Sequence, residues 1–203
     1  DAALRPIGPL PPPGRLLDPV NGVWANAGTS VPAHSEVTNI PGLKGPVDVR
    51  YDIRGVPHIF ATSEEDVYRA LGYVVARDRL FQLDIQTRAA TGRLTELVGR
   101  QALEADEEPR MMGMPRAAER KLAALDPGGV SRRMMDAYAD GINAYIDNLK
   151  PKDYPIEYKL LNARPERWKS VNSVDLLNQM GRTLASGGPD HLLVRAAALV
   201  GDS

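Results

Sequence analysis

The stretch that decides the fold covers residues 51–99 and reads YDIRGVPHIFATSEEDVYRALGYVVARDRLFQLDIQTRAATGRLTELVG. Its beginning predicts a β-hairpin, because Val47, Val49 and Tyr51 alternate with charged residues and VPHIF then forms a second short apolar run. Gly55 lies between the two runs and can adopt the positive φ that a tight turn requires. Since a two-stranded hairpin is marginal alone, we expect it to join a larger sheet.

A long helix is predicted after the hairpin. Thr62 or Ser63, with Glu65 or Asp66 three residues later, is typical of a capping box at a helix start. Gly92 is the expected end of the helix. The triplet at residues 77–79, Arg-Asp-Arg, lies in the middle and is interpreted as internal ion pairs or a solvated face. The apolar positions at helical spacing are Val67, Leu71, Val74, Val75, Phe81 and Ile85.

The remainder of the chain predicts further helices separated by loops. Residues 104–110 are acidic and are expected to be irregular up to Pro109. The stretch MMGMP at residues 111–115 is expected to be a flexible connection, whose methionines fill gaps in the core or form a lid over a substrate channel. Helices are predicted at residues 116–125, 130–149, 173–184 and 190–199.

Composition predicts a folded chain. The 203 residues are 43% hydrophobic and 25% charged, and the net charge of -1 gives no electrostatic reason to expect nucleic acid or an anionic membrane as partner. No apolar run is long enough for a membrane span, and we expect a soluble chain or one trimmed after export. The absence of cysteine excludes disulfides, a thiol nucleophile and thiolate metal sites.

Two regions differ in composition. Residues 1–45 hold many prolines and glycines and are predicted to form an extended arm, and their apolar side chains favour an arm docked on another surface, which we expect to be a partner chain. Residues 46–203 are predicted to form a helical domain with one β-hairpin, so the fold class is α+β.

The chain carries no local catalytic motif. His34, His58 and His191 are scattered and are interpreted as structural, and no HExxH, Gly-rich phosphate loop or GxSxG elbow occurs. No serine lies in a context that would activate it, although a Ser-His-Asp constellation from distant residues stays open. Asp1 cannot act as an N-terminal nucleophile, because that chemistry requires Ser, Thr or Cys at the first position.

Several motifs in order resemble the penicillin acylase family of N-terminal-nucleophile hydrolases. They are LPPPGRLLDPVNGVW, GVPHI, ALGYVVARDRLFQLD, GRLTELVG, AYADGINAYID and RPERW, and together they span nearly the whole chain. The resemblance implies that this chain is the α chain of a heterodimer, contributing helices and a hairpin to an αββα sandwich that a β chain completes. It also implies that the nucleophilic serine and the oxyanion donors lie on the β chain, so no catalytic residue is expected here.

The resemblance also implies binding residues near the end of the chain. Met180, Thr183 and Leu184 match the family's pocket-lining methionine, arginine and phenylalanine, so only the methionine is retained and an aliphatic acyl preference is expected. An alternative is that Met180 and Leu184 are core partners four residues apart on one helix. Asp190 matches a calcium-binding glutamate whose other oxygen ligands come from the β chain, or it is the acidic first-turn residue of its helix.

The resemblance implies an amidase that acts on N-acylated substrates such as penicillins, located in the periplasm or outside the cell. Its main competitor within the family is an acylase of N-acyl-homoserine lactones. Outside enzymes, the residues also fit a helical binding module, which would be a stable monomer. The α-chain interpretation instead predicts that the isolated chain exposes a large apolar surface and aggregates.

Overall fold

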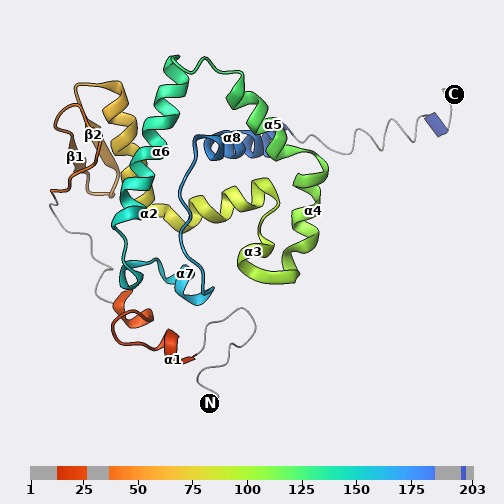
Figure 1. The fold of residues 1–203 in the computed structure, drawn as a ribbon, viewed down its shortest axis with the longest axis horizontal. Helices are drawn as coiled ribbons and strands as arrows, with labels where there is room; N and C mark the ends of the chain where they lie inside the picture. The colour runs from red at the N-terminus through yellow and green to blue at the C-terminus, as the bar shows by residue number, and fades with distance from the viewer. Residues whose placement is uncertain (1–12, 27–36, 186–197, 200–203) are drawn as a thin grey trace.

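The computed structural model describes residues 13–26, 37–185 and 198–199. Two long helices dominate this part of the chain: α2 (Glu64–Thr91) and α6 (Val130–Asn148) cross and pack extensively on each other (Figure 1). The other elements are α1 (Pro13–Leu16), η2 (Val23–Asn26), β1 (Asp48–Tyr51), β2 (Pro57–Phe60), α3 (Thr95–Val98), η3 (Gly99–Ala102), α4 (Leu103–Met111), α5 (Met114–Ala123), η4 (Pro151–Asp153), α7 (Ile156–Leu160) and α8 (Ser170–Ala185).

The core lies where α2 and α6 meet the segment formed by α7 and the loop after it. Buried side chains from all three segments form one hydrophobic cluster, and the ring of Phe81 stacks edge-on against Tyr158 at a centroid distance of 5.2 Å. The buried members are Ala76, Leu80, Leu83, Ala139, Ile142, Tyr158 and Trp168. The mostly helical fold with one hairpin is therefore confirmed.

The hairpin lies at the edge of the molecule, on the far side from α4 (Figure 1). Its strands pair antiparallel with Asp48 opposite Phe60, and the turn is confirmed, since Gly55 has φ 75°. The Asp52 carboxylate accepts hydrogen bonds from the backbone of Arg54 and Val56 at 2.8 and 2.9 Å, which fixes the turn and holds the pKa of Asp52 below its usual value. That the hairpin joins a larger sheet stays a prediction.

The prediction for the start of α2 was wrong in its details. Ser63 is the N-cap residue, but its side chain makes no capping hydrogen bond. Asp66 does not complete a capping box and instead turns into the protein, where it accepts hydrogen bonds from the backbone of Lys44 and Gly45. Gly92 ends the helix in the left-handed region, as expected.

In the Arg-Asp-Arg triplet of α2, an ion pair joins the first two residues, and the third lies at a kink. Arg77 pairs with Asp78 at 3.1 Å and contacts the Tyr51 hydroxyl of the hairpin. Arg79 has non-helical angles (φ -143°, ψ 25°), so α2 is kinked there rather than continuous.

The segment around Pro109 was also predicted wrongly. Residues 104–110 belong to the helix α4, which ends at Met111. Met112 and Gly113, the latter with φ 69°, form a tight corner, and α5 begins at Met114. The physical reason is a tertiary contact: Asp106 accepts hydrogen bonds from the backbone of Leu94 and Thr95 at 2.7 and 2.8 Å, which holds α4 against α3. The helices predicted at 116–125, 130–149 and 173–184 are present as α5, α6 and α8, whereas most of residues 190–199 lie outside the described residues.

The described part of the N-terminal arm contacts this same chain and includes two short helical turns, α1 and η2. The Lys159 ammonium donates hydrogen bonds to the Gly22 carbonyl at 3.0 Å and to Asn26 Oδ1 at 2.6 Å. Asn26 in turn donates to the Tyr154 carbonyl at 3.0 Å. Docking of the arm on a partner chain stays a prediction.

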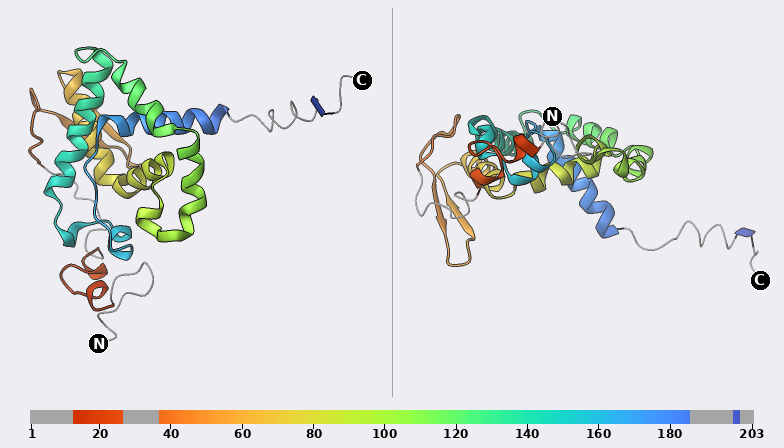
Figure 2. Two further views of the ribbon diagram at one scale, coloured as in Figure 1. Left: turned by 45° about the vertical axis from the view of Figure 1, so that its right-hand side comes forward. Right: turned by 90° about the horizontal axis from the view of Figure 1, so that it is seen from below.

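The C-terminal half of α8 extends away from the rest of the fold, which both views of Figure 2 show. Within the described ranges, no helix combines the length and the apolar character that crossing a membrane would require.

Candidate functional site

Met180, Thr183 and Leu184 lie in the last two turns of α8, on the part of the helix that projects from the fold. Met180 is 61% exposed and Leu184 is 80% exposed, so neither belongs to the core of the described chain. Together with the exposed Leu177 they form an apolar line along one side of the helix, which we call the α8 strip. Thr183 is exposed beside it and donates its hydroxyl hydrogen to the Gln179 carbonyl at 2.9 Å.

The predicted metal ligand and two of the histidines cannot be placed. Asp190, His34 and His191 lie outside the described residues. His58 lies on β2, with its Nε2 atom 3.8 Å from an Asp52 oxygen. Among residues 13–26, 37–185 and 198–199 there is no group of three or more His, Cys, Asp or Glu side chains that could hold a metal ion.

Two serines of the described segments, Ser170 and Ser173, take part in structural hydrogen bonds. At the start of α8, the Ser170 hydroxyl donates a hydrogen bond to Asp136 of α6. Ser173 Oγ accepts a hydrogen bond from the indole of Trp168 at 3.3 Å. No hydrogen bond joins His58 to a serine in this part of the chain.

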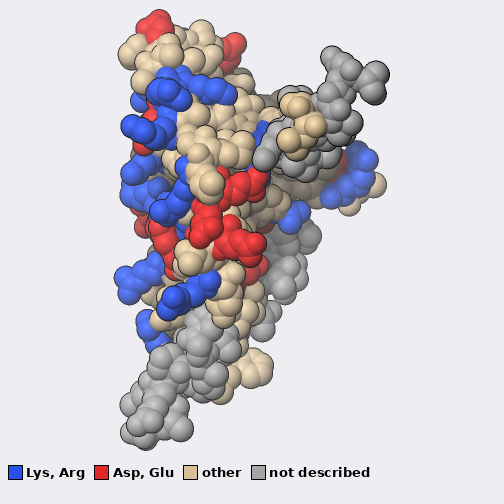
Figure 3. All heavy atoms as spheres, turned by 90° about the vertical axis from the view of Figure 1, so that its right-hand side faces the viewer, with Lys and Arg blue, Asp and Glu red and all other residues tan. Residues whose placement is uncertain are grey.

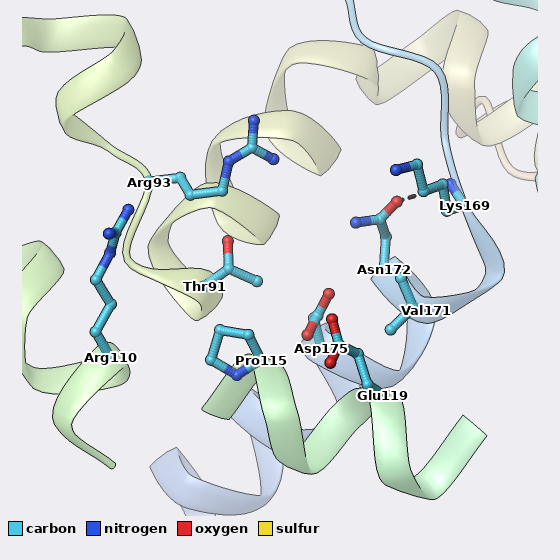
Figure 4. Close-up of a pocket in the computed structure, with 9 residues that line it drawn as sticks. All are labelled: Thr91, Arg93, Arg110, Pro115, Glu119, Lys169, Val171, Asn172 and Asp175. Atoms are coloured by element: carbon cyan, nitrogen blue, oxygen red, sulfur yellow. Dashed lines mark hydrogen bonds between the residues drawn. The ribbon is translucent and has the colours of Figure 1, made fainter. Parts of the chain in front are cut away.

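A cavity of about 370 Å³ lies beside the N-terminal half of α8, between this helix, α5 and the C-terminal end of α2 (Figure 4). The sequence did not predict it, because its walls come from four segments that are distant in the chain. Its lining residues are Thr91, Arg93, Arg110, Pro115, Glu119, Lys169, Val171, Asn172 and Asp175.

Two carboxyl groups face each other in this cavity. The side chains of Asp175 on α8 and Glu119 on α5 lie next to each other (Figure 4). Asp175 is only 5% exposed. Burial raises the pKa of Asp175 to about 6, and the negative charge of Glu119 adds to the rise, while a hydrogen bond from Asn172 opposes it. The cavity therefore contains a carboxyl group that changes its protonation near neutral pH.

A charge network centred on the buried Arg88 lies beside the cavity. Arg88 pairs through Nε with Asp84 at 2.6 Å, through Nη1 with Glu96 at 2.6 Å and through Nη2 with Glu166 at 3.0 Å. The hydroxyl of Tyr158 donates to the Asp84 carboxylate at 2.9 Å. Burial, together with the negative charge of Asp84, keeps the Tyr158 pKa far above its usual value.

Arg93 extends this network to the cavity itself, because it pairs with both Glu96 at 2.7 Å and Glu166 at 3.0 Å. These hydrogen bonds raise the pKa of Arg93 and lower the pKa of both Glu96 and Glu166. The network joins the GRLTELVG motif to the RPERW motif, so the charged residues inside those two motifs were the signal that could have revealed it.

The surface on the side of α4 has a mixed charge pattern. Acidic side chains gather in its centre, and Lys and Arg side chains flank them on both sides (Figure 3). This face provides no uniform positive field that would attract a polyanion.

Comparison with known proteins assigns the chain to a family. Residues 46–202 match the family model described as penicillin amidase. Penicillin acylase 2 proenzyme of Pseudomonas sp. is 42% identical over 157 residues, which are 77% of this chain and 20% of that protein. Acyl-homoserine lactone acylase QuiP of Pseudomonas aeruginosa is 38% identical over 144 residues, or 71% of this chain and 17% of that protein.

A solved structure agrees with these relatives. The fold is similar to a chain of the thermostable penicillin G acylase from Alcaligenes faecalis, with a TM-score of 0.66 and 30% sequence identity over 74% of this chain and 80% of that chain. The chain spans about a fifth of the length of the curated relatives that it matches. By the match over residues 46–202, the chain belongs to the penicillin amidase family.

Proposed function

We propose that this chain is the α subunit of a heterodimeric amidohydrolase that cleaves the side-chain amide of N-acylated substrates such as penicillins. The observation that carries the proposal is the structural match to a penicillin G acylase chain, since it covers 80% of that chain at 30% identity. The curated relatives are about five times longer than the matched segment, which supports the view that a second, larger part of the enzyme exists.

In this proposal the chemistry belongs to the β chain. A serine at the first position of that chain attacks the amide carbonyl, and its own α-amino group moves the proton. Oxyanion donors on the β chain stabilise the tetrahedral intermediate before water releases the acid. The hairpin β1–β2 is the part of this chain that would extend the sheet of an αββα sandwich.

The α8 strip is this chain's proposed contribution to the acyl pocket. Its three apolar side chains are exposed in the chain alone, and Met180 and Leu184 belong to the projecting C-terminal half of α8, where a β chain could close over them. Leu184 and Thr183 offer neither a stacking surface nor a positive charge, which favours an aliphatic acyl group.

Calcium and location remain proposals from the family resemblance. The described residues alone do not provide a calcium site, because no group of three or more suitable side chains exists among them. A site would require Asp190 together with ligands from the β chain. The proposed location is the periplasm or the extracellular space.

The first test is intact mass and N-terminal sequencing of every chain in the purified native enzyme. We expect a larger co-purifying chain that begins with serine and hydrolysis of penicillins with aliphatic acyl groups. A preparation that holds this chain alone, folded and monomeric, would overturn the proposal in favour of a helical binding module.

A second candidate substrate class is N-acyl-homoserine lactones. The supporting observation is the 38% identity with an acyl-homoserine lactone acylase over 144 residues. A panel of acyl chain lengths on both leaving groups separates the two classes, because the leaving group with the higher kcat/KM identifies the substrate.

Leu184→Phe tests the role of the α8 strip. We expect the ratio of phenylacetyl to aliphatic turnover, measured as kcat/KM, to rise about tenfold, because the ring adds a stacking surface to the acyl pocket. Leu103→Phe, on the half-exposed Leu103 of α4, is the matched control and should leave the ratio unchanged. An unchanged ratio in Leu184→Phe would remove the α8 strip from the pocket.

A further inference from the structure

We propose that the cavity between α2, α5 and α8 binds a small zwitterion, with its ammonium group against the carboxylates of Glu119 and Asp175 and its carboxylate against the ammonium of Lys169. This site is distinct from the α8 strip and goes beyond the acylase function. It would hold whether or not the acylase proposal is correct.

The first support is that the carboxylates of Asp175 and Glu119 have no positively charged partner in direct contact within the described segments. Neither Asp175 nor Glu119 forms an ion pair with any residue of the described segments: Asn172 is the hydrogen-bond partner of the Asp175 side chain, and Arg93 attracts Asp175 only at longer range. Because Asp175 is buried, this attraction replaces only part of its lost hydration, and no counter-charge lies in direct contact with it. A cationic group entering the cavity would supply that counter-charge.

The nature of the cation follows from the donors available. Calcium takes six to eight oxygen ligands, and magnesium takes six in a strict octahedron. Two carboxylates fill only part of either coordination sphere and leave the remainder to water, and no larger group of metal-binding side chains is present in the described residues. An ammonium group needs only two or three hydrogen-bond acceptors, which the carboxylates of Glu119 and Asp175 provide.

The opposite end of the cavity is positively charged. Lys169 and Arg93 project there, away from the two carboxylates (Figure 4). Arg93 is already held by Glu96 and Glu166, whereas the ammonium of Lys169 forms no ion pair within the described segments. The cavity therefore keeps unpaired charges of both signs apart, and a dipolar ligand can neutralise both ends at once.

Size and the remaining walls agree with a small aliphatic zwitterion. A volume of about 370 Å³ is at the low end of the range for small-molecule sites. Val171 and Pro115 supply apolar walls on either side of the two carboxylates, which suit methylene groups. The amide of Asn172 and the hydroxyl of Thr91 lie between the carboxylates and the positively charged end.

The experiment is a binding series with the purified enzyme in its native assembly. Isothermal titration calorimetry with glycine, β-alanine, γ-aminobutyrate and ε-aminocaproate varies the separation of the two charges, and butylamine and butyrate each carry only one charge. We expect at least one amino acid to bind with a Kd of about 1 mM, and roughly tenfold tighter than either single-charge probe.

Two variants locate the binding. Asp175→Asn and Lys169→Gln should each weaken the Kd of the best amino acid by about tenfold. Lys169 is on the surface, so its replacement should not disturb folding, and thermal melting checks this for both variants. The matched controls are Glu107→Gln and Lys150→Gln, which remove exposed charges outside the cavity and should leave the Kd unchanged.

Four results would overturn the proposal: no saturable binding of any amino acid, equal binding of butylamine or butyrate, unchanged affinity in both cavity variants, or a Lys or Arg side chain of another chain filling the cavity in a crystal structure of the assembly. Amide hydrolysis is measured separately on the same preparation, so a failure of the acylase proposal is recognised independently.

Discussion

At the scale of single residues, the carboxylate of Asp66 holds the segment before the hairpin in place. It is fully buried, and its two oxygens accept hydrogen bonds from the backbone of Lys44 at 3.0 and 3.1 Å and of Gly45 at 3.2 Å. Arg69 lies 3.7 Å away and supplies a counter-charge. Asp66 therefore anchors the segment before the hairpin to α2.

Asp66→Ala is expected to lower the free energy of unfolding by about 3 kcal/mol, because it removes the acceptor of the Lys44 and Gly45 N–H groups and the counter-charge of the largely buried Arg69. The measurement is urea denaturation of the purified enzyme. Glu64→Gln, an exposed neighbour in the same helical turn, should change the midpoint very little. If both variants unfolded at the same urea concentration, the anchoring role would be refuted.

Asp175 makes a prediction about pH. Its pKa rises from 3.8 to about 6 on folding, so the folded state binds this proton more tightly than the unfolded state. The free energy of unfolding therefore falls as the pH increases through that window. Asp175→Asn should be neutral below it and stabilise the protein by about 1 kcal/mol above it, a value reduced for screening in the open cavity.

The check for Asp175 is a series of urea midpoints from acidic to neutral pH for the wild type, Asp175→Asn and the surface control Glu107→Gln. The difference between Asp175→Asn and the wild type should grow as the pH rises from about 3.8 to about 6 and stay constant above that range, whereas Glu107→Gln should follow the wild type. A constant difference between Asp175→Asn and the wild type at all pH values would contradict the raised pKa.

At the scale of elements, the crossing of α2 and α6 depends on two glycines. A Cβ atom on Gly72 would lie 2.1 Å from the Tyr138 carbonyl oxygen, and one on Gly141 would lie 1.9 Å from the Arg69 carbonyl oxygen. The two helices therefore approach backbone to backbone, and no side chain sets their spacing.

Gly141→Ala should destabilise the fold by about 3 kcal/mol, because the added methyl group must push the two helices apart. Gly181→Ala on α8 is the matched control, since nothing lies within 4 Å of its added Cβ atom. That control should stabilise the protein by roughly 0.5 kcal/mol through helix propensity. Equal thermal midpoints for the two variants would be incompatible with the close crossing.

The elements that could be predicted are those with a local signal. α2 and α6 have apolar residues at helical spacing, and the turn of the hairpin has Gly55, so their sequence alone identifies them. The C-terminal end of α2 was also predicted correctly, because Gly92 is a local stop signal.

α4 and the cavity were not predictable because long-range contacts create them. Pro109 inside a helix costs about 3 kcal/mol by local propensity, yet the hydrogen bonds from Leu94 and Thr95 to Asp106 hold the segment in helical form. Likewise, Asp175 and Glu119 meet only when α5 packs on α8. Of the site residues given by the family resemblance, the structure describes the α8 strip and Thr183 but not Asp190.

At the scale of the whole molecule, large apolar side chains remain exposed in several regions of the described chain, and two of these regions bear on assembly. One is the hairpin, with Tyr51, Ile53, Val56 and Phe60, and the other is the α8 strip. Exposed apolar surface of this kind is typical of a protein interface. Both regions therefore favour a chain that is completed by a partner.

We expect this chain to aggregate when it is produced alone and to be soluble when it is produced with the remainder of the enzyme. Size-exclusion chromatography with light scattering measures the difference. Introducing lysine at both Met180 and Leu184 should raise the soluble fraction of the isolated chain, because it breaks the α8 strip. A monodisperse wild-type monomer with a cooperative melting transition would count against a missing partner.

The two tryptophans of the chain lie in very different surroundings: Trp24 in the arm is 64% exposed, whereas Trp168 in the core is 7% exposed and donates its indole hydrogen to Ser173. Their fluorescence therefore separates two events. Acrylamide should quench Trp24 in the free chain and lose access to it if a partner covers the arm, while a red shift from Trp168 reports unfolding of the core. The chain thus carries built-in optical probes of assembly and of folding.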